Sequence, residues 1–236
     1  TVRAEWRLDL PNICGKCHEK QYEEWKESMH SNSFSDPIHQ AFLKAEGTEF
    51  CSGCHLPLTE QTPVFVKGFE AGKPIIEPNP DFKPELMAEG ATCATCHLRQ
   101  WVRHGPPREG RTEEEASQIH EVKFSEDYEK AEFCASCHQE EMEHVPGTPL
   151  EVIPPGVKVL WDNTYGEWKE WQESLAEGHP AKGRQCQDCH MPKAQHAWKG
   201  GHSPDTLKRA VEVQVATDKE AYTPGEKVSA KISVAN

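Results

Sequence analysis

The stretch that decides the fold is Cys14-Gly15-Lys16-Cys17-His18, a five-residue pattern that the chain repeats. Four further copies follow, at 51–55, 93–97, 134–138 and 186–190. All ten cysteines of the chain fall inside the five copies and none is left over. These cysteines are Cys14, Cys17, Cys51, Cys54, Cys93, Cys96, Cys134, Cys137, Cys186 and Cys189.

This CxxCH pattern is the signature of covalent haem attachment. Two thiols two residues apart reach the two vinyl groups of one porphyrin, and the adjoining histidine supplies an axial nitrogen to the iron. Zinc sites and disulfide frameworks also use paired cysteines, but neither explains a histidine after every second cysteine. The sequence therefore predicts five haem c groups. The predicted proximal ligands are His18, His55, His97, His138 and His190.

The composition contains too few hydrophobic residues for an interior made of side chains alone. Hydrophobic residues make up 36% of the 236 residues, charged residues 28%, and the mean hydropathy is -0.78. Five haems would leave little chain for each haem, so we expect the porphyrins to form the apolar interior. By the same logic as in small metal-dependent domains, the chain without haem should be largely unfolded.

The predicted fold is mainly α, with long irregular loops around a pentahaem core. The motifs recur with a loose period near forty residues, which indicates a repeated unit of one haem, one helix and one loop. We expect helices over 12–30 and 125–144, and an irregular, proline-rich loop over 61–84. Capping boxes at Thr112 and Thr164 predict two further helix starts, the first on a helix that carries His120.

The pattern changes after Pro204. Apolar residues alternate with polar ones over 211–215 and again over 228–234, which predicts a β-hairpin opening a sandwich-like segment. We expect a pentahaem domain over 1–205 and a β-strand segment over 206–236. Because two strands are marginal as an independent sheet, either the natural chain continues or the strands complete a sheet with another chain. The first alternative is favoured.

Thirteen histidines leave eight outside the motifs, enough to give every haem a second histidine ligand. Bis-histidine ligation would lower the reduction potentials relative to histidine/methionine ligation. His30 lies twelve residues beyond His18, too far along a helix to reach the same iron, so it would bind a different haem. The predicted distal ligands are His30, His120, His179, His196 and His202; the weaker candidates are His104, His144 and His39.

Particular stretches resemble the cytochrome c-554 family. The first motif followed by Trp25-x-x-Ser28-x-His30 resembles the opening of that family. The fourth motif with His120 upstream, and Cys186-Gln-Asp-Cys189-His190-Met191-Pro192, carry the resemblance over residues 12–205. The family is similar in haem arrangement to hydroxylamine oxidoreductase and the pentahaem nitrite reductases. The resemblance implies closely stacked haem pairs that pass electrons along a chain.

The resemblance also supports His30, His120 and the segment 196–202 as distal ligands, whereas His179 and His39 have no clear counterpart. The enzymatic relatives differ from this sequence. Nitrite reductases mark the catalytic haem with lysine in place of the motif histidine, and all five motifs here end in histidine. No tyrosine of this chain can be matched to the one that crosslinks the catalytic haem of hydroxylamine oxidoreductase.

Three functions are therefore compared, and an electron carrier is favoured over an enzyme. An electron carrier needs only saturated haems in near contact. A reductase or oxidase of small nitrogen or sulfur species needs one haem with an open sixth position. The third alternative is a subunit of an extracellular cytochrome filament, or another homo-oligomer.

Charge and export constrain the partners and the location. The net charge of -13 argues against nucleic acid or anionic membrane as partners. It suits basic redox proteins, other multihaem cytochromes or extracellular acceptors. No apolar run reaches the length of a membrane span. Covalent haem is attached outside the cytoplasm, so we expect a signal peptide to have been removed before Thr1 and a periplasmic or extracellular location.

Overall fold

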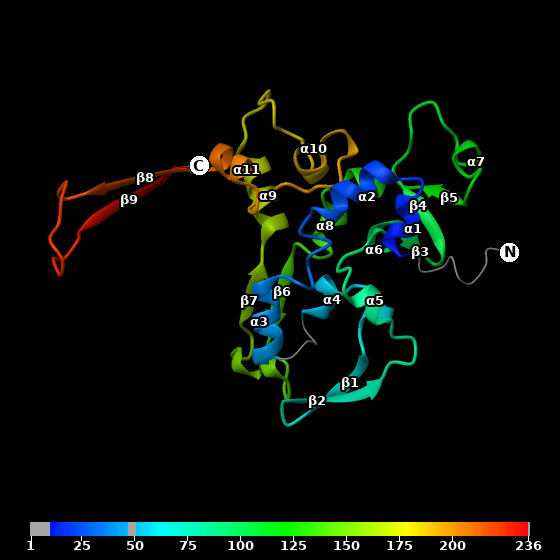
Figure 1. Cartoon of the computed structure of the whole chain (residues 1–236), viewed down its shortest axis with the longest axis horizontal. Coiled ribbons are helices and arrows are strands. Elements are labelled where there is room, and N and C mark those ends of the chain that lie inside the picture. Colours follow the sequence, from blue (N-terminus) through cyan, green and yellow to red (C-terminus); the bar gives the residue numbers. More distant parts are fainter. Residues whose placement is uncertain (1–9, 47–50, 236) are drawn as a thin grey trace. The chain divides into compact units, whose positions relative to one another are not determined.

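The computed structural model describes residues 10–46 and 51–235 (Figure 1). The chain divides into two compact units, Thr1–Trp198 and Lys199–Asn236, and each is described by itself. The domain boundary predicted after residue 205 stays a prediction, because compactness does not show that either part folds alone.

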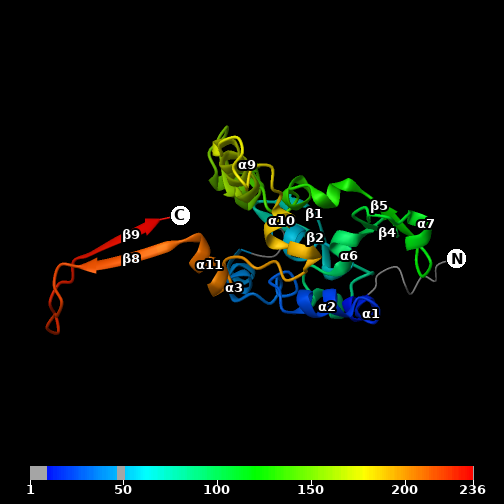
Figure 2. The ribbon, with the colours of Figure 1, turned by 90° about the horizontal axis from the view of Figure 1, so that it is seen from above.

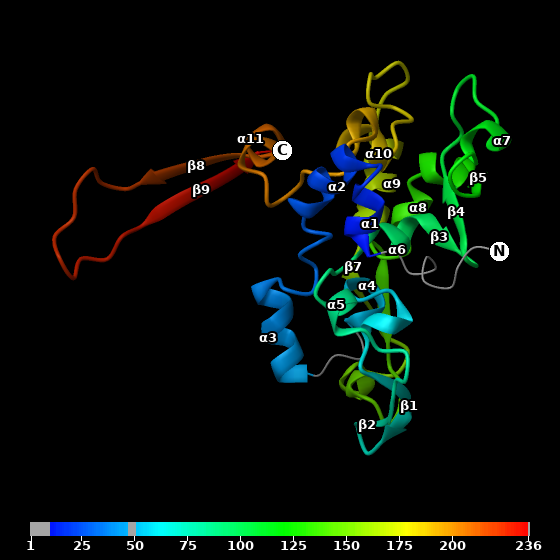
Figure 3. The same cartoon turned by 45° about the vertical axis from the view of Figure 1, so that its right-hand side comes forward.

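Each CxxCH motif lies in a short helix or begins at the end of one. The motif histidine closes a turn, as where the His18 N–H donates to the Cys14 carbonyl at 2.9 Å. One turn brings residues three and four apart to the same face, so both cysteines and the histidine can meet one porphyrin. The motif helices gather within the first unit although they come from across its sequence (Figures 1 and 3). They are α1 (Pro11–Gly15), α4 (Ser52–His55), α6 (Cys93–His97), α8 (Glu132–Ala135) and α10 (Cys186–His190).

Longer helices connect and flank the motifs. Helix α3 begins after Asp36, whose Oδ1 accepts the backbone N–H groups of Ile38 and His39, each at 2.9 Å. The remaining α-helices of this unit are α2 (Glu19–Lys26), α3 (Pro37–Glu46), α5 (Pro84–Met87), α7 (Glu113–Ala116) and α9 (Thr164–Ser174). Single 3-10 turns are η2 (Thr59–Gln61), η3 (Glu126–Glu129), η4 (Pro149–Val152) and η5 (Pro192–Ala194).

Three small sheets complete the described part of the first unit. The strands are β1 (Val64–Glu70), β2 (Lys73–Pro78), β3 (Leu98–Arg99), β4 (Val102–Gly105), β5 (Val122–Phe124), β6 (Glu140–Glu143) and β7 (Lys158–Asp162). Strands β1 and β2 form an antiparallel hairpin, as do β3 with β4 and β6 with β7. Strand β5 pairs with β4 in parallel. The β1–β2 hairpin projects to one side of this unit (Figure 3).

The prediction of a mainly α fold is wrong: the structure is 36% helix and 21% strand, although the irregular loops are present. The helix predicted over 12–30 is interrupted at His18, whose φ of -111° and ψ of 48° lie outside the helical region. Over 125–144 only η3 and α8 are helical, and the chain then enters β6. In both places the helix ends inside the motif, at Gly15 and at Ala135, so the apolar spacing that suggested a long helix belongs to separate short segments.

The loop predicted over 61–84 is instead the β1–β2 hairpin. Its turn residues Ala71 and Gly72 both have positive φ, 49° and 75°. Two positive φ values in a two-residue connection match the twist of antiparallel strands. The prolines lie near the strand ends, where a missing N–H is tolerated.

The two predicted capping boxes have different outcomes. The box at Thr112 is confirmed, because the Glu115 N–H donates to Thr112 Oγ1 and the Thr112 N–H donates to Glu115 Oε2. That helix ends at Ala116, so His120 lies beyond it. The helix predicted from Thr164 is present as α9, but its N-cap is Asn163 and the box is absent.

The buried apolar core is small. Among the described residues it consists of Trp25, Leu56, Leu86, Ala94, Ala131 and Ile153. The accessible surface is 16550 Å², against about 11,000 Å² for a compact monomer of this mass. Large apolar side chains such as Phe42, Ile75 and Leu160 are 42%, 48% and 52% exposed. The chain therefore exposes more surface, and more of its apolar side chains, than a compact protein of this mass.

The second unit contains helix α11 (Pro204–Ala210) and strands β8 (Glu212–Thr217) and β9 (Ala230–Ala235). The strands pair antiparallel, with Val213 opposite Val234 and Val215 opposite Ile232 (Figure 2). The predicted β-hairpin is confirmed, while the sandwich-like continuation stays a prediction. Within the described ranges of both units, no helix combines the length and the apolarity that crossing a membrane requires.

Candidate haem-binding sites

The motif cysteines are available for thioether bonds. None of the ten forms a disulfide, and every one of them is at least partly exposed. In the part of the chain that the structure describes, no group of three or more histidine, cysteine or acidic side chains could hold a metal ion such as zinc. The geometry therefore favours neither the disulfide framework nor the zinc-ribbon interpretation of the paired cysteines.

Thiols from different motifs touch one another. The neighbouring thiols of Cys14, Cys137 and Cys186 raise the pKa values of Cys93, Cys54 and Cys134, respectively, and burial adds to each effect. These contacts place the first motif beside the third, the second beside the fourth, and the fourth beside the fifth. Because each cysteine would hold one edge of its own porphyrin, haems on neighbouring motifs would lie edge to edge.

Three motif histidines each face a histidine from outside the motifs. The ring centres are 6.3 Å apart for His18 and His120, 6.1 Å for His97 and His196, and 6.2 Å for His138 and His30. A metal–nitrogen bond of about 2 Å, with roughly 1 Å more from each nitrogen to its ring centre, separates two axial imidazole rings by about 6 Å. The three pairs therefore have the spacing of two imidazoles on opposite sides of one iron.

Both members of the His97 pair are held by backbone carbonyls. His97 Nδ1–H donates to the His104 carbonyl at 2.8 Å, and His196 Nδ1–H donates to the Ala194 carbonyl at 2.9 Å. The His196 backbone N–H donates to Glu24 Oε2 at 2.9 Å. A second partner of this kind fixes the ring and the tautomer of a metal-binding histidine. In both rings Nε2 is left as the nitrogen that can bind iron.

The His138 pair depends on burial. His30 follows α2, and the edge of Trp198 meets its ring at 4.5 Å. Its Nδ1 is buried without a hydrogen-bond partner among the described residues. Burial, with a smaller contribution from His138, lowers the pKa of His30 to about 4. The imidazole is therefore neutral at pH 7, which is the form that binds metal.

Burial also lowers the pKa values of other members of these pairs. Desolvation is the main cause for His18, His97 and His196, and neighbouring positive charge adds to it in each case. The residues around the motifs thus keep the imidazoles neutral. The donor set fits haem iron, which takes neutral imidazole as an axial ligand.

The second motif is arranged differently. His55 Nδ1–H donates to the Ser33 carbonyl at 2.7 Å, so this ring is also fixed from the backbone. Its partner is His39, whose ring stacks on His55 at 4.0 Å with an angle of 7° between the planes. Two rings in face-to-face contact do not have the spacing of the other three pairs.

The other sequence-predicted ligands are exposed. His179 accepts the Ala181 N–H at Nδ1 over 3.2 Å. His202 belongs to the second unit, and His190 ends helix α10. The ligand roles of these three residues stay predictions. Of the weaker candidates, His144 donates through Nδ1–H to the Ile153 carbonyl at 2.7 Å.

Tyr128 and His104 make contacts with the third motif that the sequence did not predict. The Tyr128 hydroxyl donates to the Cys96 carbonyl at 2.6 Å, and its ring stacks on His97 at 5.4 Å and 8°. His104 acts through its backbone carbonyl on His97. Both contacts join segments through the backbone of a motif, and no side-chain pattern in the sequence marks them.

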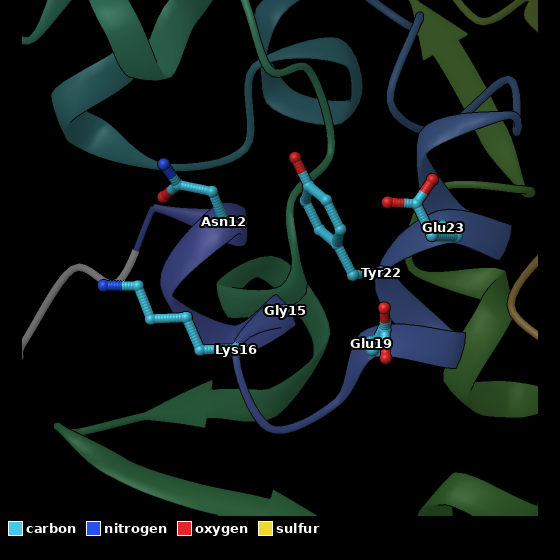
Figure 4. Close-up of a pocket in the computed structure, with 6 residues that line it drawn as sticks. All are labelled: Asn12, Gly15, Lys16, Glu19, Tyr22 and Glu23. Atoms are coloured by element: carbon cyan, nitrogen blue, oxygen red, sulfur yellow. The ribbon is translucent and has the colours of Figure 1, made fainter.

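A shallow hollow of about 370 Å³ lies beside the first motif (Figure 4). Tyr22 stands between its two sides, and an added Cβ at Gly15 would lie 2.7 Å from Tyr22 Cγ. The lining includes Lys16, Glu19 and Glu23. The hollow is polar and lies at the surface. Its main structural feature is the packing of Tyr22 on the backbone of the motif.

Comparison with known proteins agrees with this geometry. Residues 13–74 match the model of the family described as cytochrome c554 and c-prime. This match and the five motifs support a multihaem c-type cytochrome. A penta-heme cytochrome c552 from Thermochromatium tepidum has a similar fold, with a TM-score of 0.57 and 20% sequence identity. The likeness covers 97% of this cytochrome and 65% of that chain, so this cytochrome spans less than two thirds of that protein's length. No curated protein matches the sequence.

Proposed function

We propose that this cytochrome binds five haem c groups and passes electrons along them. The observation that carries the proposal is the set of three histidine pairs at 6.1–6.3 Å, each joining a motif histidine to a histidine from elsewhere in the chain. His120, His196 and His30 would be the sixth ligands of the haems on the first, third and fourth motifs. A haem with two imidazoles exchanges electrons without binding a substrate.

The contacts between motifs support a continuous path. Thiol contacts link the first motif to the third, and the fourth motif to both the second and the fifth. The Cys96 and Cys137 thiols also interact electrostatically, which brings the third motif near the fourth. The proposed order is therefore first, third, fourth, with the second and fifth haems both beside the fourth.

The chemistry of the chain suggests its surroundings. The net charge of -13 suits basic redox partner proteins. We infer export to the periplasm or beyond the cell surface, because thioether attachment of haem takes place outside the cytoplasm. Within the export compartment, haem supplies the redox chemistry, and the chain supplies ligands, burial and spacing.

A haem count combined with electron paramagnetic resonance tests the proposal. Intact mass and alkaline pyridine spectra should give five haems per chain, and replacing Cys51 and Cys54 by alanine should remove one. The oxidised holoprotein should show low-spin signals that do not change when nitrite, hydroxylamine or nitric oxide is added. A count below five, or a high-spin signal that shifts with these additives, would overturn the electron-carrier proposal in favour of an open-site enzyme.

A further inference from the structure

The segment 33–39 holds the second motif from two directions. The Ser33 carbonyl accepts His55 Nδ1–H at 2.7 Å, and Ser33 Oγ donates to the His55 carbonyl at 2.9 Å. The ring of His55 is therefore fixed with Nε2 as its free nitrogen. This argument rests on the proposed function, in which His55 is the proximal ligand of the second haem.

The same segment leads into α3, which fixes His39. Asp36 Oδ1 accepts the N–H groups of Ile38 and His39, so the first turn of the helix has a defined direction. The edge of Phe34 meets the His39 ring at 6.2 Å. His39 is only 4% exposed. A histidine on a helix of this charged chain would ordinarily face water, so its burial against a motif needs a reason.

The ring of His39 has an unused nitrogen in this buried position. Its Nε2 is inaccessible to solvent and has no hydrogen-bond partner among the described residues. Buried polar groups in native proteins are nearly always satisfied. A bond to iron would satisfy this nitrogen, as it would satisfy the buried Nδ1 of His30 in the fourth-motif pair.

The other three pairs supply the pattern. Each of His18, His97 and His138 faces one histidine from outside the motifs. His55 also has one such neighbour, His39, although these two rings are stacked. We propose that His39 is the sixth ligand of the haem on the second motif. With the rings now 4.0 Å apart, the ring centres must separate by about 2 Å to take iron between them. Because the two rings are stacked, the His39 side chain would also have to turn so that its Nε2 faces the Nε2 of His55.

Replacing His39 by alanine in the holoprotein tests the assignment. We expect one haem per chain to change from low-spin to high-spin in the resonance spectrum, and to bind one equivalent of carbon monoxide after reduction. His120→Ala should give the same change at the first haem and serves as the positive comparison. Ile38→Ala, at an exposed position of the same helix, is the matched control and should leave every haem low-spin.

A second variant separates ligation from packing. His39→Met places another iron ligand at the same position, so the second haem should stay low-spin while one reduction potential rises, because methionine ligation raises haem potentials. If His39 only packs on the side of His55, the methionine variant leaves all potentials in place.

Two results would overturn the assignment: five low-spin haems in His39→Ala, or the same high-spin haem in Ile38→Ala. Neither result would change the haem count or the behaviour of the other pairs, on which the proposed function depends.

Discussion

The indole Nε1–H of Trp25 donates to the Ala91 carbonyl at 2.8 Å, and Trp25 is only 3% exposed. This bond joins the helix after the first motif to the residues that lead into the third motif. The Cys14 and Cys93 thiols are a second point at which these two motifs approach each other. The indole therefore holds together the two motifs that come first in the proposed electron path.

Replacing Trp25 by phenylalanine should destabilise the holoprotein by about 1–3 kcal/mol, because a buried carbonyl loses its donor. Urea unfolding followed by haem absorbance measures the change. Trp171, which is 43% exposed on α9, provides the matched control. An equal loss of stability in Trp171→Phe would show that the size of the indole, and not the Trp25 hydrogen bond, determines the change in the free energy of unfolding.

Gly15 should not tolerate a side chain. Its Cβ would lie 2.7 Å from Tyr22 Cγ, closer than any ordinary contact. Gly15→Ala should lower the unfolding free energy by about 1–3 kcal/mol, because the packed ring has to move. A Cβ added at Gly53, in the second motif, would lie in open space, so Gly53→Ala should change the unfolding free energy only slightly. Thermal unfolding of both holoproteins checks the difference.

Acidification should release His30 from iron only in strong acid. Burial lowers its pKa to about 4, while an unfolded histidine titrates near 6.5. Between these values only the unfolded state takes up the proton, so the folded state loses stability as the pH falls through this window, by about 3 kcal/mol in total. Above pH 6.5 the folded state keeps the whole of the stability that depends on neutral His30.

Resonance spectra recorded at stepwise lower pH provide the measurement. One low-spin signal should persist to about pH 4 and disappear below it. His30→Met provides the control, because methionine does not titrate. A midpoint near 6.5 for the loss of this signal would contradict the role of burial at His30.

Tyr128 should influence the third haem through the backbone of its motif. Tyr128→Phe keeps the ring on His97 but removes the hydroxyl that donates to the Cys96 carbonyl at 2.6 Å. We expect a loss of about 1 kcal/mol in stability. Tyr128→Leu removes the ring contact as well, and should also shift one reduction potential in a redox titration. Identical titrations of both variants would exclude a role for the stacked ring.

The chain should not fold without haem. Among the described residues the buried apolar core is small, and much apolar surface is exposed. Expression without the haem-attachment machinery should therefore give a chain with little fixed secondary structure by circular dichroism and rapid proteolysis. The holoprotein under the same conditions is the control. A cooperative unfolding transition in the haem-free chain would contradict this expectation.

The motifs could be predicted from sequence because their chemistry is local. Two cysteines and a histidine within five residues define an attachment site wherever the surrounding chain goes. The sequence predicted His30, His120 and His196 as distal ligands and His138, His18 and His97 as proximal ligands. It did not predict which distal histidine pairs with which proximal one. Pairing depends on which distant segments meet, and no spacing in the sequence records that.

The errors arise where tertiary structure overrides local pattern. His39 was the weakest histidine candidate, and only its burial and its contact with His55 distinguish it. The long helix predicted over 12–30 breaks at His18 because the chain there departs from helical geometry. The β1–β2 hairpin was missed because its turn, Ala71-Gly72, lies in a proline-rich stretch that resembles a loop.

The three histidine pairs have a thermodynamic consequence. His18 and His120, His97 and His196, and His30 and His138 are each about 100 residues apart in the sequence. With iron between them, each pair closes a covalent and coordinate loop of that size. Closing a loop of about 100 residues with a disulfide removes roughly 4.7 kcal/mol of chain entropy from the unfolded state in the simplest treatment. Because all the cysteines lie in the motifs, the irons would serve as the long-range cross-links of this chain.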